Sequence, residues 1–300
     1  MVNAIRKPFV IPAVACAVVI VWVLAWNFDP IVNGHPSYLV FYVGFLVAAL
    51  AALAWAFFKP DSKGRLWLSV PGTVVLILAT IGAWLLTPFA ATDVALDAMT
   101  STAEVTVTTT GSSITLEPTG EALGVGLVFQ PGARVDSRAY AHILRPLVEA
   151  GHRVVIVKQP LGVAFFASGF AASWAEQHPD VEWAVGGHSL GGVVASMNAA
   201  DDRQLGDLVL WASYPASDIS DTPDLRAVSV FGTEDELTDP AKVDETASDL
   251  PDGTAFVPIV GAVHSYFGDY GEQSGDGEPT VSRDEAQAQI VSATLSFLGR

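Results

Sequence analysis

The sequence has almost no cysteine, and its first third has almost no charge. Cys16 is the only cysteine among 300 residues, which excludes a disulfide framework and a cysteine metal site within one chain. Residues 1–88 contain five basic and two acidic residues, whereas residues 89–300 contain 10 basic and 30 acidic ones. The second part therefore carries a net charge of −20. This charge argues against nucleic acid as a partner, because proteins bind nucleic acid by neutralising its phosphates.

The apolar first third contains three runs without a charged residue, each long enough or nearly long enough for a helix to cross a bilayer. These runs are Phe9–Trp26, Tyr38–Phe58 and Leu66–Phe89. Tryptophan and tyrosine lie toward their ends, as expected at a membrane interface. We therefore predict that residues 1–89 form a membrane anchor of three transmembrane helices. A cleaved signal peptide is the alternative for the first run, because Arg6 and Lys7 precede it.

Basic residues between the runs predict the orientation of this anchor. Arg6 and Lys7 precede the first run, the loop 27–37 has no Lys or Arg, and the loop 59–65 has three. Because cytoplasmic loops are enriched in Lys and Arg, we expect the amino terminus and the second loop in the cytoplasm. Three spans then place everything after Phe89 outside the cytoplasm, on a multi-pass protein of the cell membrane. The spans contain no ionisable residue, as expected of an anchor rather than of a transport path.

After a predicted linker at residues 90–103, the pattern of residues 104–300 indicates an α/β domain. Two β-branched runs, Glu104–Thr109 and Ser113–Pro118, are separated by a Gly-Ser hairpin signal. Buried strands and helices then alternate up to a closing helix at Ser282–Leu298, which begins with capping-box spacing. This order predicts a mostly parallel sheet covered by helices on both faces, with the hairpin as an antiparallel edge. The remaining strands are predicted at Leu123–Phe129, Val154–Val157, Trp183–Val185, Leu208–Ala212, Ala227–Phe231 and Ala255–Val260, and the remaining helices at Ser137–Ala150, Val163–Gln177, Leu190–Ala200 and Pro240–Ser248.

A Gly-x-Ser-x-Gly pentapeptide at residues 187–191 follows the predicted strand Trp183–Val185 and precedes the predicted helix Leu190–Ala200. A sharp strand-to-helix turn at this place would expose the Ser189 hydroxyl. It would also point the Leu190 N–H, at the helix amino terminus, toward an oxyanion. We therefore predict Ser189 as a catalytic nucleophile and Leu190 as an oxyanion donor. A glycine-rich turn used only for packing is the alternative.

A serine nucleophile needs a base, and the base needs an orienting carboxylate. In this strand–turn–helix arrangement the chain order is serine, acid, histidine, and of six histidines only His264 follows Ser189. The acid is expected after the strand Ala227–Phe231, where Asp235 is the favoured candidate and its two neighbouring glutamates are expected in solvent. Asp239 is interpreted as the amino-terminal cap of the next helix.

Two further loops are expected at the same edge of the sheet as the serine. The loop Gln130–Asp136 follows a strand and should supply the second oxyanion donor. Its proline has no N–H and its glycine would permit a tight turn, so Ala133 is the predicted donor. In the loop that follows the histidine, Asp269 and Asp276 are interpreted as surface residues rather than as metal ligands.

These segments together resemble the α/β-hydrolase superfamily, and within it the small dienelactone-hydrolase-like branch. The resemblance covers about Leu123–Arg300 and rests, in order, on QPGARVD, VVIVKQPLG, GGHSLGG, FGTEDELTDP and VHSYFGDYG. It implies the α/β-hydrolase fold and a triad of Ser189, Asp235 and His264. Dienelactone hydrolases proper use a cysteine nucleophile, whereas this chain has a serine, so their substrate class is not carried over.

We therefore expect a membrane-anchored extracytoplasmic serine hydrolase, a carboxylesterase that acts on small or short-acyl esters without cofactor or metal. The short-acyl expectation follows from the interval Ser213–Arg226, which is too short for a helical cap. Phe165, Phe166 and Phe170 are expected either to form an apolar pocket wall or to pack a covering helix onto the sheet. Acyl transfer to a cell-envelope component and a non-catalytic binding module on the same fold are the alternatives.

Overall fold

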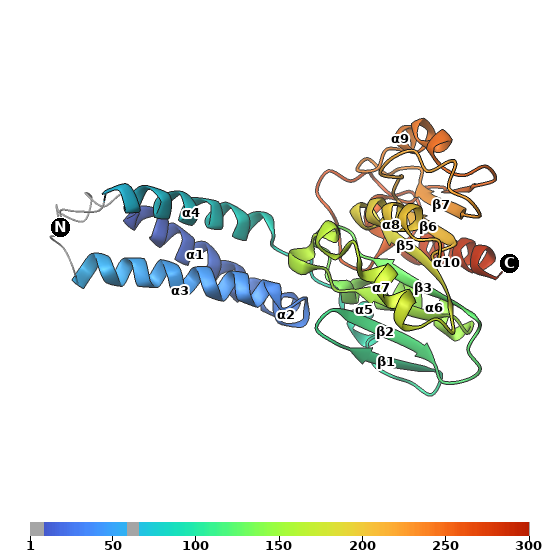
Figure 1. Cartoon of the computed structure of the whole chain (residues 1–300), viewed down its shortest axis with the longest axis horizontal. Coiled ribbons are helices and arrows are strands. Elements are labelled where there is room, and N and C mark those ends of the chain that lie inside the picture. The colour runs from blue at the N-terminus through green and yellow to red at the C-terminus, as the bar shows by residue number, and fades with distance from the viewer. Residues whose placement is uncertain (1–8, 59–65, 300) are drawn as a thin grey trace. The chain divides into compact units, whose positions relative to one another are not determined.

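The computed structural model describes residues 9–58 and 66–299, and Figure 1 shows their helices and strands. The chain separates into two compact units, Met1–Pro88 and Phe89–Arg300. Arg6, Lys7 and the basic loop 59–65, on which the predicted orientation rests, lie outside the described residues.

The first unit is a bundle of apolar helices. Its helices are α1 (Val10–Trp26), α2 (Phe28–Asn33), α3 (Ser37–Phe58) and α4 (Leu66–Leu85). Ala13 and Cys16 of α1 are fully buried, and such small side chains let helices approach closely. The Tyr42 hydroxyl of α3 donates a 2.9 Å hydrogen bond to the Ala83 carbonyl of α4. Many large apolar side chains on these helices are exposed, Val40 among them, so the bundle has an apolar exterior.

Helix lengths in this unit only partly match the three predicted spans. Among the described residues, α3 is the one helix long and apolar enough to cross a bilayer, with 22 residues and a mean hydropathy of 2.3. The helix α1 (Val10–Trp26) is shorter, and so is the segment Val70–Leu85 of α4. The third predicted run extended to Phe89, but α4 ends at Leu85, because Pro88 disfavours a helical conformation for the residue before it. The three-span anchor therefore stays a prediction.

The second unit contains an eight-stranded sheet in the order β1-β2-β4-β3-β5-β6-β7-β8. The hairpin β1–β2 pairs antiparallel to β4, and all later neighbours pair parallel. The prediction of a mostly parallel sheet with an antiparallel amino-terminal edge is confirmed. The strands are β1 (Val105–Thr109), β2 (Ser113–Pro118), β3 (Val125–Gln130), β4 (Arg153–Val157), β5 (Glu182–His188), β6 (Asp207–Trp211), β7 (Arg226–Gly232) and β8 (Ala255–Ile259).

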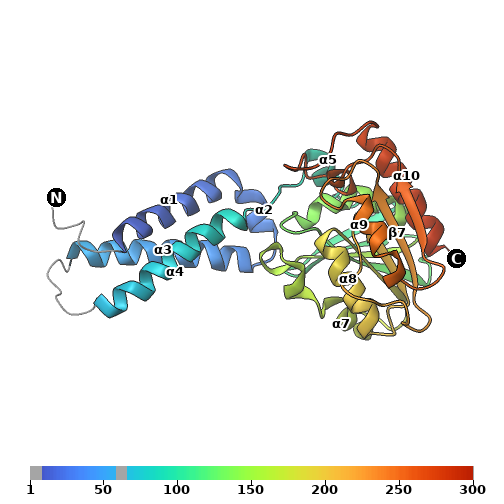
Figure 2. The ribbon, with the colours of Figure 1, turned by 90° about the horizontal axis from the view of Figure 1, so that it is seen from above.

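Helices cover both faces of this sheet. One core layer lies between the sheet and the pair α6 (Ala141–Glu149) and α10 (Arg283–Leu298). The other lies between the sheet and the pair α7 (Phe170–Gln177) and α8 (Leu190–Asp201). Figure 2 shows α10 on one side of the strands and α7 and α8 on the other. The short helix α9 (Pro240–Glu245) follows β7. Apolar strands with both faces covered explain why the sequence shows continuous apolar runs here rather than alternation.

The segment predicted to be a linker is part of the second unit. It contains the helix α5 (Asp93–Asp97), and the Arg145 guanidinium of α6 donates hydrogen bonds to the carbonyls of Ala98, at 2.7 Å, and Thr100, at 3.1 Å. Phe89 forms a parallel bridge with Val135. The small, polar composition of the segment gave no sign of this packing, because backbone carbonyls make the contacts.

Candidate active site

Ser189 lies in a sharp turn between β5 and α8. Its backbone has φ 53° and ψ −125°, a conformation that costs a non-glycine residue about 1–3 kcal/mol. The Ser189 N–H donates a 3.0 Å hydrogen bond to the Trp211 carbonyl at the end of β6, which holds the turn against the sheet. Side chains could not be added at the flanking glycines: a Cβ on Gly187 would overlap the Gly191 backbone, and a Cβ on Gly191 would overlap the Gln130 carbonyl.

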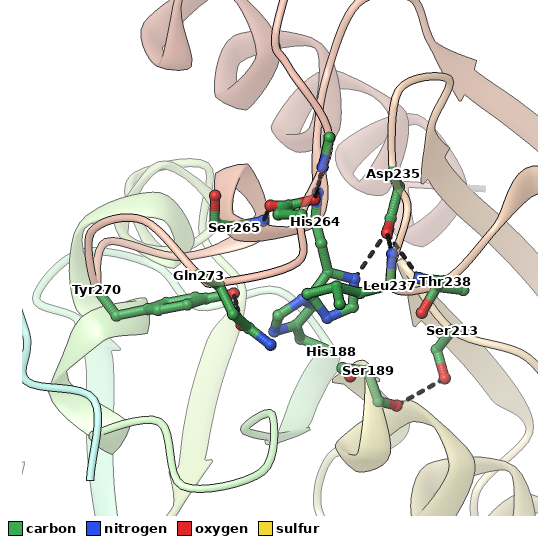
Figure 3. Close-up of polar contacts among 12 residues, drawn as sticks. His188, Ser189, Ser213, Asp235, Leu237, Thr238, His264, Ser265, Tyr270 and Gln273 are labelled. Atoms are coloured by element: carbon green, nitrogen blue, oxygen red, sulfur yellow. Dashed lines mark hydrogen bonds and ion pairs between the residues drawn. The ribbon is translucent and has the colours of Figure 1, made fainter.

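Asp235 and His264 come together beside this turn (Figure 3). His264 Nδ1 lies 2.8 Å from Asp235 Oδ2, and both residues are 2% exposed. The other oxygen of Asp235 accepts backbone N–H bonds from Leu237, at 2.8 Å, and Thr238, at 2.6 Å. The carboxylate is therefore fixed at both oxygens. Among the described residues no hydrogen bond links the Ser189 hydroxyl to His264, and such bonds often tighten only when a substrate is bound.

Asp276 fixes the backbone that carries His264. Its carboxylate accepts backbone N–H bonds from His264 at 3.0 Å, Ser265 at 2.8 Å and Gly277 at 2.9 Å. The sequence predicts Asp276 only as a surface residue and does not indicate these contacts. Its contacts depend on how the loop folds back over twelve residues, and no local sequence period signals such a fold.

Two backbone N–H groups near Ser189 are free to meet an anion. The Ala133 and Leu190 N–H groups donate no hydrogen bond to any part of the chain that the structure describes. The two segments adjoin, because the α8 residue Gly191 packs on the carbonyls of Gln130 and Pro131. Both N–H groups are thus unpaired within the described residues, and their role as oxyanion donors stays a prediction.

A buried hydrogen-bond chain supports the turn that contains Ala133. The Gly132 N–H donates to the Tyr140 hydroxyl at 2.9 Å, and this hydroxyl lies 2.8 Å from His188 Nδ1. The tautomer of His188 determines whether this hydroxyl donates to Nδ1 or accepts from it. Burial lowers the pKa of His188 well below its usual value and raises that of Tyr140, so both groups are neutral near pH 7. The His188 ring lies 4.5 Å from the His264 ring.

Comparison with known proteins identifies the family of this chain. The model of the family described as "Alpha/beta hydrolase family" matches residues 126–288, more than half of the chain. The chain belongs to the alpha/beta hydrolase family. This membership places it among the hydrolases. A search of the curated proteins found no match.

Solved structures resemble this hydrolase in fold. A CIB-like hydrolase from Thermoplasma acidophilum is 14% identical with a TM-score of 0.51, covering 65% of this chain and 98% of that one. TT1662 from Thermus thermophilus is 14% identical with a TM-score of 0.50, covering 65% and 99%. Dienelactone hydrolase from Anabaena variabilis is 14% identical with a TM-score of 0.49, covering 65% and 99%. At this identity, the two structures with TM-scores of 0.50 and 0.51 show the fold alone.

The remaining carboxylates near the hydrolase site have structural partners. Asp239 accepts the Ala241 N–H at 2.8 Å and caps α9, as interpreted from the sequence. Asp269 was interpreted as a surface residue, but it is 1% exposed. It accepts a 3.0 Å bond from Gln287 and lies 3.2 Å from His142 Nδ1. No group of three or more potential metal ligands occurs within residues 9–58 and 66–299.

Sequence reasoning missed the contact between Tyr140 and His188. The two residues are 48 positions apart, and neither lies in a recognisable motif with the other. The one available signal was position: His188 directly precedes the serine at the end of a strand, where a side chain must face either the turn or the core.

Proposed function

We propose that this hydrolase is a serine carboxylesterase in which Ser189 attacks, His264 acts as the base and Asp235 orients His264. The observation that carries the proposal is the 2.8 Å contact between the buried His264 and Asp235 beside the strained Ser189 turn. A carboxylate fixed by two backbone N–H groups can hold the imidazole in one tautomer and stabilise the imidazolium.

The proposed reaction has two halves. His264 accepts the Ser189 proton as the hydroxyl oxygen attacks the ester carbonyl, and the Ala133 and Leu190 N–H groups stabilise the resulting oxyanion. The tetrahedral species collapses as His264 gives its proton to the leaving alcohol, which leaves an acyl group on Ser189. Water, deprotonated by His264, then attacks this acyl group and restores the free serine.

The proposed substrate is an ester with a short acyl chain. Residues 212–225, between β6 and β7, form no helix, so no helical cap is available there to enclose a long chain. Of the three phenylalanines considered for a pocket wall, Phe170 stacks on Trp174 at 5.8 Å and joins the core under α7. Phe165 and Phe166 instead are exposed.

Hydrolysis of nitrophenyl esters of graded chain length tests this proposal. We expect higher kcat/KM for the acetate or butyrate than for the palmitate. Ser189→Ala should lower kcat by roughly 10³-fold or more, whereas Ser292→Ala, at an exposed site on α10, should not change it. Preference for the palmitate would contradict the short-acyl substrate. Absence of fluorophosphonate labelling on folded protein would instead favour a non-catalytic binding module.

We further propose that the first unit anchors the chain in a membrane by three helices, with the hydrolase unit outside the cytoplasm. The apolar exterior of the bundle and the 22-residue helix α3 support embedding, and the Lys and Arg content of the loops supports the orientation. Protease added to intact cells or spheroplasts should digest the hydrolase unit. Protection of that unit, with digestion after lysis, would contradict the orientation.

A further inference from the structure

One charge-free segment of the strongly acidic second unit carries two exposed aromatic side chains. Residues 159–175 contain no Asp, Glu, Lys or Arg, although residues 89–300 carry a net charge of −20. Within this segment Phe165 is 47% and Phe166 64% exposed. We call Phe165 and Phe166 the apolar rim. Adjacent large apolar side chains that are exposed in a charge-free segment are a candidate interaction site.

The apolar rim borders the proposed active site. The Gln130 side chain, at the end of β3, donates a 3.3 Å hydrogen bond to the carbonyl of Ala167, directly after the two phenylalanines. The Arg134 N–H, in the turn with Ala133, donates a 2.7 Å hydrogen bond to the Gly162 carbonyl of the same segment. The charge-free segment is thus fixed to the turn that supplies a proposed oxyanion donor.

The chain enters the second unit at this same turn. The Phe89 N–H donates to the Arg134 carbonyl at 2.8 Å, and the Asp136 N–H donates to the Phe89 carbonyl at 2.9 Å. The Arg134 guanidinium also lies over the Phe89 ring, 4.8 Å from its centre. The apolar helix α4 ends at Leu85, four residues earlier. Covalent geometry limits that stretch to about 14 Å whatever its conformation.

We propose that the apolar rim contacts the bilayer that holds the anchor, and that the enzyme takes short-acyl esters of lipophilic alcohols directly from that bilayer. This inference rests on the proposed function. A tether of at most about 14 Å from α4 keeps the turn with Ala133 near the membrane surface, and the charge-free segment is fixed to that turn. The lipid is zwitterionic rather than anionic, because the acidic unit would be repelled by an anionic surface.

Spin labelling of the full-length chain in phosphatidylcholine nanodiscs tests the contact. Cys16 is the only cysteine, so Cys16→Ala provides a background without a reactive thiol. A nitroxide attached after Phe165→Cys should collide more often with oxygen than with a water-soluble nickel complex. Leu123→Cys is the matched control. Leu123 is 46% exposed and precedes the amino-terminal end of β3, whereas the proposed active-site loops follow the carboxyl ends of the strands. Equal, water-like accessibility at both positions would overturn the proposal.

Kinetics of the same preparation test its consequence for substrate. The double variant Phe165→Ser, Phe166→Ser should raise the KM for dodecyl butyrate dissolved in the nanodisc by roughly tenfold or more, from lost apolar contact. It should leave kcat/KM for nitrophenyl acetate in solution unchanged, as should Leu123→Ser for both esters. Equal losses of activity on both esters would show that the two phenylalanines form a wall of the substrate pocket. No change on either ester would show that they do not contact the bilayer. Either result would overturn the proposal.

Failure of the proposed function has a different signature. Wild-type protein that cleaves neither ester would contradict the esterase, while the oxygen and nickel accessibilities would still report whether the apolar rim meets lipid. Protein that fractionates without the membrane would contradict the anchor. Wild-type activity on nitrophenyl acetate together with a water-exposed label at position 165 would contradict the apolar rim alone.

Discussion

Asp276→Ala should damage both stability and turnover, because this carboxylate holds the turn that carries His264. Three backbone N–H groups lose their acceptor: those of His264, Ser265 and Gly277, at 2.8–3.0 Å. The first two belong to buried residues. Asp276 itself is only partly buried, so water can reach its place and accept some of these hydrogen bonds.

The expected size follows from the two buried donors. Each donor left unpaired costs about 1–3 kcal/mol, and allowing for water we expect a loss of about 2–4 kcal/mol in the free energy of unfolding. For a unit of this size each kcal/mol lowers Tm by about 2–4 °C, so Tm should fall by about 4–16 °C. The kcat should fall by tenfold or more, because a misplacement of about 1 Å in a catalytic group can cost about 10²-fold.

Thermal unfolding and ester hydrolysis, measured below the Tm of the variant, check this prediction. Asp239→Ala is the matched control: it removes one helix-capping bond, worth about 1 kcal/mol, and should leave kcat unchanged. Asp276→Asn keeps one acceptor oxygen and should give intermediate kcat. If Asp276→Ala retains wild-type kcat, the proposed positioning of His264 is wrong, whatever the change in Tm.

Three further predictions concern single side chains. Asp235→Asn should lower kcat by about 10⁴-fold by disturbing the histidine tautomer. Asp239→Asn should change kcat by less than about twofold. A large loss for Asp239→Asn and a small one for Asp235→Asn would show that Asp235 is not the acid. Tyr140→Phe removes the acceptor for the Gly132 N–H, so kcat should fall with little change in KM, and an unchanged kcat would contradict this role. The hydrogen bond that His142 donates to the buried Asp269 carboxylate raises the pKa of His142. This pair stabilises the fold below about pH 6.5 and ceases to do so as pH rises through the raised pKa. His142→Gln should therefore lower Tm more at about pH 5.5 than at about pH 8.5, and equal losses would contradict the pair.

Much of the second unit could be predicted because its sequence pattern is local. Alternating apolar strands and helices defined the sheet, and the chain order of serine, acid and histidine pointed to Ser189, Asp235 and His264. The structure brings Asp235 and His264 into contact; their catalytic roles and that of Ser189 stay predictions. Asp239 could be separated from Asp235 because Pro240 follows it, as expected at a helix start.

Two of the features that sequence reasoning missed depend on contacts between residues that are distant in the sequence. Asp276 binds N–H groups 11 and 12 residues earlier, and Tyr140 meets His188 across 48 residues. The helix α5 is only five residues long, too short for an amphipathic period to show. In the first unit, composition predicted apolar helices but overestimated the third, because Pro88 ends the helical conformation before Phe89.

Trapping of an acyl-enzyme tests the central claim most directly. The full-length protein is mixed with nitrophenyl butyrate, quenched with acid during the burst phase, digested and analysed by peptide mass spectrometry. We predict a butyryl group on Ser189, absent after Ser189→Ala and still present after Ser292→Ala. A butyryl group on another residue, or steady turnover by the wild-type protein without any acylated peptide, would contradict Ser189 as the nucleophile.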